Sequence, residues 1–184
     1  MKLIHPAIGL RRATQADSTL LADLGAETFV DTFGAHNTTD DMQRYLVASF
    51  APGIQAAELA DPSAVCLIAE VGDQPAGYAR LREGQPSRAL VAARPIELVR
   101  LYARTPWIGR GVGAALMRAA IDEAGVRGCD VMWLGVWERN ERAIAFYRRW
   151  GFLEFGDHAF LLGNDRQTDL LMARSVTFLR RQEP

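Results

Sequence analysis

A glycine-rich loop between an apolar run and an amphipathic segment most limits how this chain can fold. The apolar run 96–103 predicts a strand, and Gly109, Gly111 and Gly113 then lead into a segment with apolar residues at helical spacing. Glycines let backbone N–H groups approach a ligand closely, and the first N–H groups of a helix have no partner within it. Together with the partial positive charge of a helix N-terminus, these groups predict a site for a pyrophosphate.

Two other interpretations fit the glycines taken alone. The loop could be a tight turn before a helix, or it could be the dinucleotide fingerprint of a Rossmann enzyme. In that fingerprint the first glycine follows its strand almost directly, whereas residues 104–108 intervene here. The fingerprint also belongs near the start of a domain, and this loop lies past the middle of the chain. The spacing therefore disfavours a Rossmann enzyme, and Arg110 can add a charge-assisted contact to the phosphates.

The other segments predict strands and helices that alternate along the chain. In order they are a strand at 8–12, a helix ending near 33, a helix over 40–50, a short helix through 59, a hairpin of 65–71 and 76–81, the strand 96–103, the helix after 113, a strand at 131–137, a helix from 140 to 150, and final strands at 152–162 and 167–172. Nothing in the 184 residues resembles an interdomain linker. We expect a single domain over 1–184, with its core at about 8–175.

Charge and composition exclude several classes of function. The formal net charge is −1, so we expect no general attraction to nucleic acid or to an anionic membrane. Lys2 is the only lysine, which excludes Schiff-base chemistry and the Walker phosphate loop inside the domain. The N-terminus does not read as a signal peptide, and no stretch reaches the ~18 apolar residues of a membrane span. A cytoplasmic location is the expectation.

The cysteines and histidines point to neither disulfide nor metal chemistry. Cys66 and Cys129 are isolated in apolar or mixed segments, as buried reduced thiols commonly are. His5, His36 and His158 lie far apart and fall in no metal-ligand spacing. We therefore expect no disulfide and no metal.

A second motif lies downstream of the glycine loop. Asn140, Ala143, Phe146 and Tyr147 are followed by Gly151-Phe152, in the pattern Asn-x-x-Ala-x-x-Phe-Tyr-x-x-x-Gly-Phe. With the glycine loop, this segment resembles the GCN5-related N-acetyltransferase (GNAT) superfamily over about residues 8–175.

In that superfamily a Gln/Arg-x-x-Gly-x-Gly/Ala loop binds the pyrophosphate of coenzyme A. Gly111 and Gly113 match this pattern, but Ile108 stands where glutamine or arginine is usual. The resemblance therefore implies the backbone cradle but not the usual side-chain contact.

The resemblance implies an α/β (α+β) fold and a cofactor site. The fold is a central mixed, mostly antiparallel twisted sheet of about seven strands, flanked by helices on both faces. The co-substrate is acetyl-coenzyme A, and the implied binding residues are Leu101, Tyr102, Ala103, Gly109, Arg110, Gly111, Val112, Gly113, Ala114, Asn140 and Tyr147. Asn140 also has a purely structural interpretation as a helix N-cap.

Two residues are candidates for acid–base catalysis. Tyr147 could protonate the departing thiolate, although it could instead be a packed wall of the site. Strict alternation puts Glu97, Val99, Leu101 and Ala103 on one side of their strand, from which Glu97 could accept the amine proton through a water. The alternative for Glu97 is a solvated carboxylate at the strand end.

Further similarities concern the acceptor amine. The segments 28–34, 97–102 and 163–169 resemble the PaiA-type polyamine acetyltransferases. Glu27, Asp31 and Phe33 belong to the helical region that borders the acceptor pocket in this superfamily, where carboxylates would attract a polyamine; an ordinary charged helix face is the alternative.

We expect a small-molecule amine as the acceptor, most simply a polyamine, and a monomer or homodimer as the assembly. The alternatives are a protein or peptide amine as the acceptor, and a coenzyme A-binding sensor that does not catalyse transfer.

Overall fold

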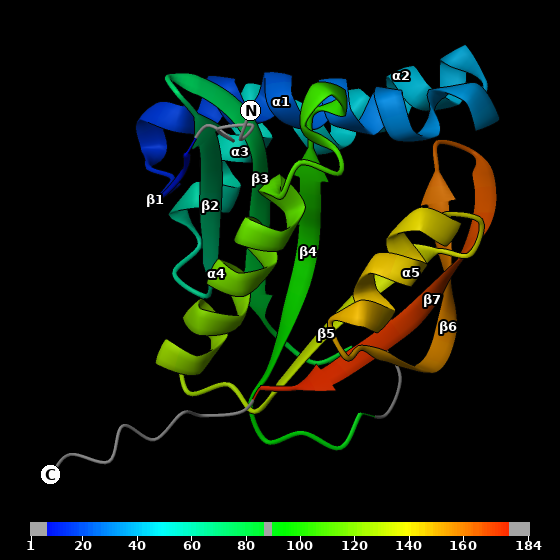
Figure 1. The fold of residues 1–184 in the computed structure, drawn as a ribbon. Coiled ribbons are helices and arrows are strands. Elements are labelled where there is room, and N and C mark those ends of the chain that lie inside the picture. Colours follow the sequence, from blue (N-terminus) through cyan, green and yellow to red (C-terminus); the bar gives the residue numbers. More distant parts are fainter. Residues whose placement is uncertain (1–6, 87–89, 177–184) are drawn as a thin grey trace, which may run out of the picture.

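A mixed sheet of seven strands runs through the part of the chain that the structure describes, residues 7–86 and 90–176 (Figure 1). In this computed structural model the strand order is β1-β2-β3-β4-β5-β7-β6, and only β4 and β5 pair in parallel. The strands are β1 (Ile8–Arg12), β2 (Ala64–Val71), β3 (Gln74–Glu83), β4 (Pro95–Ala103), β5 (Val131–Trp137), β6 (Leu153–Leu162) and β7 (Asp165–Ser175). The predicted mixed, mostly antiparallel sheet is confirmed.

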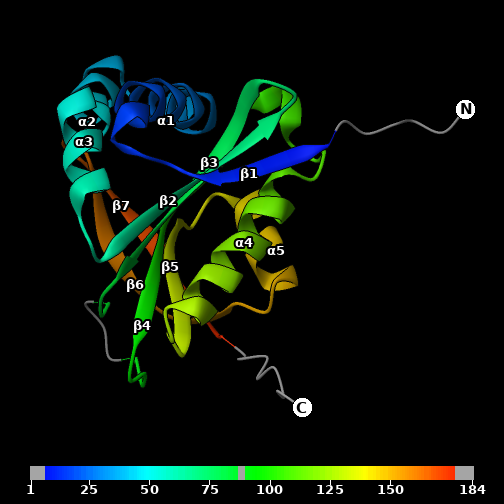
Figure 2. The same cartoon turned by 90° about the vertical axis from the view of Figure 1, so that its left-hand side faces the viewer.

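Helices cover both faces of this sheet, as predicted (Figure 2). One face carries α1 (Ser18–Phe33), α2 (Thr39–Phe50) and α3 (Pro52–Ala60), and the opposite face carries α4 (Val112–Val126) and α5 (Glu141–Arg149). Short 3-10 helices are η1 (Gln15–Asp17), η2 (Gly34–His36) and η3 (Thr105–Trp107). Within the described ranges, none of these helices has both the length and the apolar character needed to cross a membrane.

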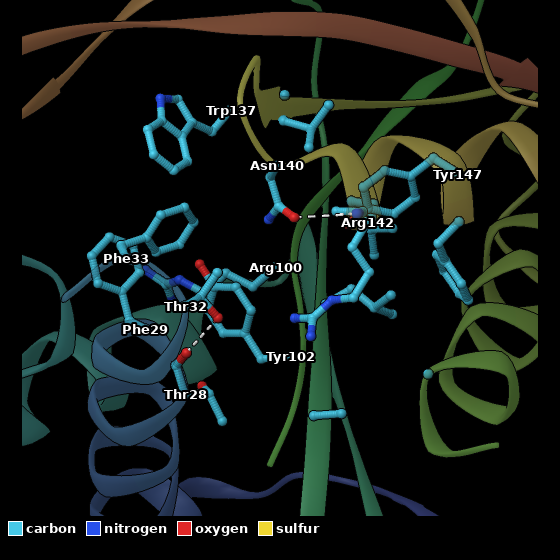
Figure 3. Close-up of a pocket in the computed structure, with 18 of the residues that line it drawn as sticks. Thr28, Phe29, Thr32, Phe33, Arg100, Tyr102, Trp137, Asn140, Arg142 and Tyr147 are labelled. Carbon is cyan, nitrogen blue, oxygen red and sulfur yellow. Dashed lines mark hydrogen bonds between the residues drawn. The ribbon is translucent and has the colours of Figure 1, made fainter. Parts of the chain in front are cut away.

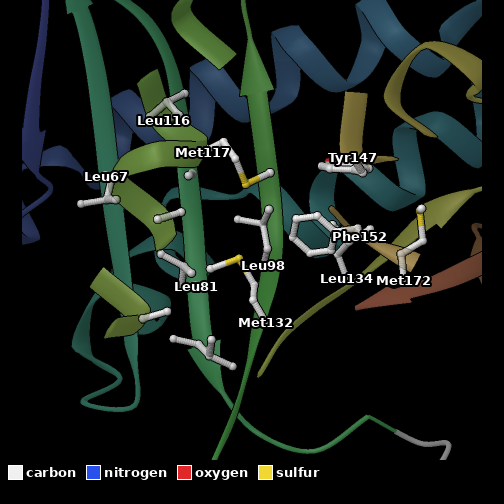
Figure 4. Packing of buried hydrophobic residues seen from close by; sticks show 14 of the residues in the cluster. Leu67, Leu81, Leu98, Leu116, Met117, Met132, Leu134, Tyr147, Phe152 and Met172 are labelled. Carbon is white, nitrogen blue, oxygen red and sulfur yellow. The ribbon is translucent and has the colours of Figure 1, made fainter. Parts of the chain in front are cut away.

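The main hydrophobic core lies between the sheet and α4 and α5 (Figure 4). Leu116 and Met117 of α4 are fully buried there against strand residues such as Leu81 and Leu98. The predicted burial of both cysteines is confirmed, and they form no disulfide. Burial raises the pKa of Cys66 to about 11, which makes this thiol a poor nucleophile near neutral pH.

Of the last two strands, β6 ends at Leu162 as predicted, whereas β7 is longer than its sequence pattern indicated. β7 extends over Asp165–Ser175, beyond the predicted 167–172, because it pairs with β5 on one side and β6 on the other. Gly163, with φ of 61°, supplies the left-handed conformation in the turn that joins β6 to β7.

Two irregularities open the sheet at its centre. β4 and β5 are paired only from Pro95↔Val131 to Glu97↔Trp133, and beyond this point they diverge (Figure 1). In addition, the register between β3 and β4 shifts at Val99, which is left without a partner as a β-bulge. The edge of β4 that faces β5 therefore has no neighbouring strand over its second half.

Candidate active site

A cavity of about 650 Å³ occupies the opening between β4 and β5 (Figure 3). Its lining comes from both layers of helices: α1 and α2 contribute from one face of the sheet, and α4 and α5 from the other. The cavity therefore passes through the sheet, and two ligands can enter it from opposite faces and meet between the strands.

The glycine loop forms the start of α4 and borders this cavity. Gly109 and Gly111 have φ of 75° and 94°, left-handed conformations that side-chain-bearing residues rarely adopt, and Gly111 is the N-cap of α4. The first N–H groups of α4 follow directly. Of the six loop residues predicted to bind the cofactor, four line the cavity: Gly109, Gly111, Gly113 and Ala114.

The two remaining loop residues point elsewhere. The Arg110 guanidinium lies over the Trp107 ring, with its central carbon 5.9 Å from the ring centroid, and Val112 is fully buried in the core. Neither side chain is among those that line the cavity.

The residues around this helix start fit a coenzyme A diphosphate. A Cβ placed on Gly113 would lie in ordinary contact with the Phe146 ring, at 3.8 Å, so α4 and α5 pack closely at this point. Arg142 and Arg149 of α5 also line the cavity and can contribute positive charge. The sequence analysis missed these two arginines, although their place inside the Asn140 to Phe152 motif was a usable signal.

β4 carries three of the predicted cofactor residues along the cavity. Leu101, Tyr102 and Ala103 all line it, on the part of β4 that no longer pairs with β5. Their backbone groups on this edge are left without a strand partner. Such an edge can hydrogen-bond an extended ligand lying parallel to it.

The bulge at Val99 corrects one expectation about β4. We expected Glu97 to share a face with Leu101 and Ala103, but the extra residue reverses the alternation. Leu101 and Ala103 pack toward α4, whereas Glu97 points to the opposite face and accepts a hydrogen bond of 2.7 Å from Arg82 Nη2. Glu97 still borders the cavity, at its closed end where β4 and β5 are paired.

α5 presents Tyr147 and Asn140 to the cavity from the α4 side. The Tyr147 ring packs edge-on against Phe146 and Phe152, and burial raises the pKa of its phenol above the ordinary value. The hydroxyl is therefore protonated at neutral pH, as an acid must be before it acts. The Asn140 side chain accepts a hydrogen bond of 3.2 Å from the backbone N–H of Ala143.

This contact makes Asn140 the N-cap of α5, and it gives a first prediction. Asn140→Ala removes the only side-chain acceptor identified at this helix start and should lower the free energy of unfolding by about 1 kcal/mol. Urea denaturation measures the loss. Asn140→Asp, which preserves an acceptor oxygen, is the control and should stay within about 0.5 kcal/mol of the original protein. Equal stability of both variants would contradict the capping role.

Aromatic rings line the end of the cavity that lies away from the start of α4. Phe33 of α1 lies edge-on to Trp137 of β5 with centroids 5.7 Å apart, and Tyr45 of α2 lies edge-on to Phe160 of β6 at 5.5 Å. All four line the cavity. Phe33, which the sequence analysis assigned to the acceptor pocket, therefore lines the cavity.

The structure does not bring Glu27 and Asp31 to the cavity. Glu27 accepts a hydrogen bond of 2.8 Å from Arg104 Nη2, and Asp31 accepts one of 2.7 Å from the Thr105 hydroxyl. Both carboxylates face the loop after β4, because the α1 face that lines the cavity consists of Thr28, Phe29, Thr32 and Phe33. These two residues tie α1 to that loop.

A histidine and an aspartate that sequence reasoning did not combine meet in the cavity instead. His158 of β6 and Asp169 of β7 are direct partners in the strand register, with Nε2 and Oδ2 3.8 Å apart. Burial, partly offset by His158, raises the pKa of Asp169 to about 6. Counting residues outward from the Gly163 turn would have paired these two positions. Within the described residues, no group of three or more His, Cys, Asp or Glu side chains could hold a metal ion.

The sheet with its diverging strands, together with the glycine-capped helix beside the opening, defines the class of acyl-coenzyme A-dependent transferases. Residues 27–152 match the acetyltransferase (GNAT) family. The chain belongs to this family and is an acetyl-coenzyme A-dependent N-acetyltransferase.

Sequence relatives agree with this assignment. An uncharacterized N-acetyltransferase from Lactobacillus delbrueckii subsp. lactis is 35% identical over 153 residues, which cover 83% of this chain and 88% of the relative. An uncharacterized N-acetyltransferase from Mycobacterium tuberculosis (strain ATCC 25618 / H37Rv) is 31% identical over 160 residues, covering 87% of this chain and 98% of the relative.

Solved structures share the fold. The PaiA N-acetyltransferase from Thermoplasma acidophilum in complex with coenzyme A superposes with a TM-score of 0.76 at 18% identity, over 92% of this chain and 99% of that one. The ribosomal-protein-S18-alanine N-acetyltransferase from Escherichia coli gives a TM-score of 0.66 at 18% identity, over 97% and 99% of the two chains. At such identities the likeness extends to the fold alone.

Proposed function

We propose that this protein transfers the acetyl group of acetyl-coenzyme A to a polyamine or another small primary amine, by direct attack within a ternary complex. The observation that carries the proposal is the cavity that passes through the sheet, from the start of α4 to the aromatic wall formed by α1, β5 and β6. Acetyl-coenzyme A supplies an activated acetyl thioester, and the two ends of the cavity let donor and acceptor meet between β4 and β5.

The donor end is assigned to α4, α5 and β4. Backbone N–H groups of Gly111–Ala114 would hold the diphosphate, and Arg142 and Arg149 would add charge. The free edge of β4 at Leu101–Ala103 would bind the pantetheine arm. Ile108 is compatible with this proposal, since the anion contacts would come from backbone amides and not from the side chain at 108.

Tyr147 is the proposed acid. Its hydroxyl, protonated and in the cavity, would donate its proton to the sulfur as the thiol leaves. Cys66 and Cys129 are buried and do not line the cavity. This supports direct transfer rather than an acetylated cysteine.

The acceptor end combines aromatic faces with negative charge. Phe33 and Trp137 offer rings to which an ammonium group is attracted, and Glu97 and Asp169 bring carboxylates to the same cavity. A small cationic amine suits this chemistry. We further propose a cytoplasmic enzyme, acting as a monomer or homodimer, with no nucleic-acid or membrane partner.

An acceptor panel tests the function. With acetyl-coenzyme A present, thiol release should accelerate more than about tenfold over the acceptor-free rate when polyamines are offered, and less with amino acids or peptides. A preference for peptides would replace the proposed acceptor with a protein amine. Coenzyme A binding without thiol release for any acceptor would contradict transfer and support a sensor.

A further inference from the structure

We propose that the His158–Asp169 pair, rather than Glu97, takes the proton from the acceptor's ammonium group. This inference rests on the proposed transfer to a primary amine.

Strand register places the pair on the acceptor face of the sheet. Trp137 of β5, Asp169 of β7 and His158 of β6 are consecutive partners across three strands, so their side chains project from the same face. The Trp137 ring contacts Phe33 of α1 and His36 of η2, which identifies this face as the one covered by α1 and α2. The pair therefore lies opposite α5, which carries Tyr147.

Gly135 leaves room for a substrate beside the pair. A Cβ on Gly135 would lie 3.3 Å from Asp169 Oδ2 and 3.4 Å from His158 Nε2. Gly135 itself is exposed although β5 is a central strand, because β4 has diverged from β5 at this level. An acceptor nitrogen in the cavity can thus approach both titratable atoms from the same point.

The surroundings of Asp169 suit a base. Burial is the largest influence and raises its pKa; the charge and hydrogen bond of His158 lower it, and Glu138 beyond the end of β5 raises it. Tyr45 of α2 also lies within electrostatic range. With the resulting pKa of about 6, the carboxylate is ionised above that pH and is more basic than an ordinary aspartate.

Glu97 is less suited to this role. Arg82 Nη2 donates a hydrogen bond of 2.7 Å to its Oε2, so one of the two carboxylate oxygens already has a partner on β3. Glu97 also sits at the last paired position of β4 and β5, away from the open part of the cleft.

The proton balance of the step is as follows. An N–H bond of the ammonium group breaks, the proton passes to Asp169 Oδ2 beside His158, and the freed electron pair on nitrogen bonds to the acetyl carbon. The carbon–sulfur bond breaks, and the sulfur takes the Tyr147 proton. The nitrogen loses a second proton, which restores the Tyr147 hydroxyl through solvent, and Asp169 releases its own proton to solvent.

The test is the dependence of kcat/KM on pH for the full-length protein with spermidine. With a base, the ammonium form is used, so kcat/KM should stay level from about pH 6 to 9 and fall below that range. In Asp169→Asn only the free amine reacts, so kcat/KM should rise about tenfold per pH unit and be about a hundredfold low at pH 7. His158→Gln should move the profile in the same direction.

Three comparisons decide the outcome. Glu154→Gln, a charge-removing change on β6 outside the cavity, should keep the original profile. Coenzyme A affinity should be unchanged in Asp169→Asn, which separates a lost base from a lost fold. A profile like the original one in both Asp169→Asn and His158→Gln, or the steep profile in Glu97→Gln alone, would overturn the inference.

The inference and the function on which it depends fail differently. If the unmodified protein releases no thiol with any amine, the proposed function itself is wrong. If the unmodified protein is active but the pH profile of kcat/KM does not change in Asp169→Asn or His158→Gln, only the inference about the base is wrong.

Discussion

Tyr147→Phe is expected to lower kcat by about a thousandfold while leaving the affinity for coenzyme A within about twofold. The substitution deletes one oxygen and keeps the ring that packs against Phe146 and Phe152. The pocket therefore keeps its shape and loses only the proton donor. Without this donor the sulfur must leave as a thiolate or take its proton from water.

Two measurements check this result. Steady-state kinetics of thiol release give kcat, and calorimetric titration with coenzyme A gives the affinity. Tyr78→Phe provides a matched control, because it also deletes one phenol oxygen, from a buried ring that does not line the cavity, and it should leave kcat unchanged. If Tyr147→Phe keeps its kcat, Tyr147 is a wall of the site and another group protonates the sulfur.

Gly111→Val should weaken coenzyme A binding by about a hundredfold. Space is not the constraint, because a Cβ on Gly111 would meet only the Ile8 side chain, at 3.5 Å. The constraint is the φ of 94°, which a β-branched residue adopts only at a cost of about 1–2 kcal/mol. The loop would relax, and the N–H groups that follow would leave the positions in which they face the phosphates.

A glycine at the far end of the same helix supplies the control for this second prediction. Gly125 lies in α4 with open space around its Cα, so Gly125→Ala should leave coenzyme A affinity unchanged and raise stability by up to about 1 kcal/mol. Calorimetric titration and thermal unfolding measure the two effects separately. Unchanged affinity in Gly111→Val would show that the start of α4 does not bind the diphosphate.

Local patterns predicted most of the fold. Apolar periodicity identified the strands and helices, and the Asn140 to Phe152 segment was found as a cap, a helix and a glycine stop. These features depend on residues close together in the chain. The same is true of the glycine loop, whose φ values and place before α4 agree with the prediction.

Side-chain direction was predicted less well. Glu97 was assigned to the face of Leu101 and Ala103 by strict alternation, because no residue of this strand indicates that Val99 forms a bulge. Glu27 and Asp31 were assigned to the acceptor pocket, but the rotation of α1 on the sheet turns them toward Arg104 and Thr105. A helix face is chosen by what packs against it, and the helix sequence does not contain that partner.

The acceptor end of the cavity also separates what the sequence predicts from what the tertiary structure decides. His158 and Asp169 are eleven residues apart, and counting from the Gly163 turn pairs them; the role proposed for them depends on the burial of Asp169 and on the bare backbone of Gly135 on another strand. Sequence alone therefore determined the order of the elements, the glycine-capped start of α4 and the family motif, since each depends on short-range residue order. Tertiary structure decided where β4 and β5 part, which carboxylates reach the cavity and which histidine and aspartate meet there, because those depend on contacts between distant segments.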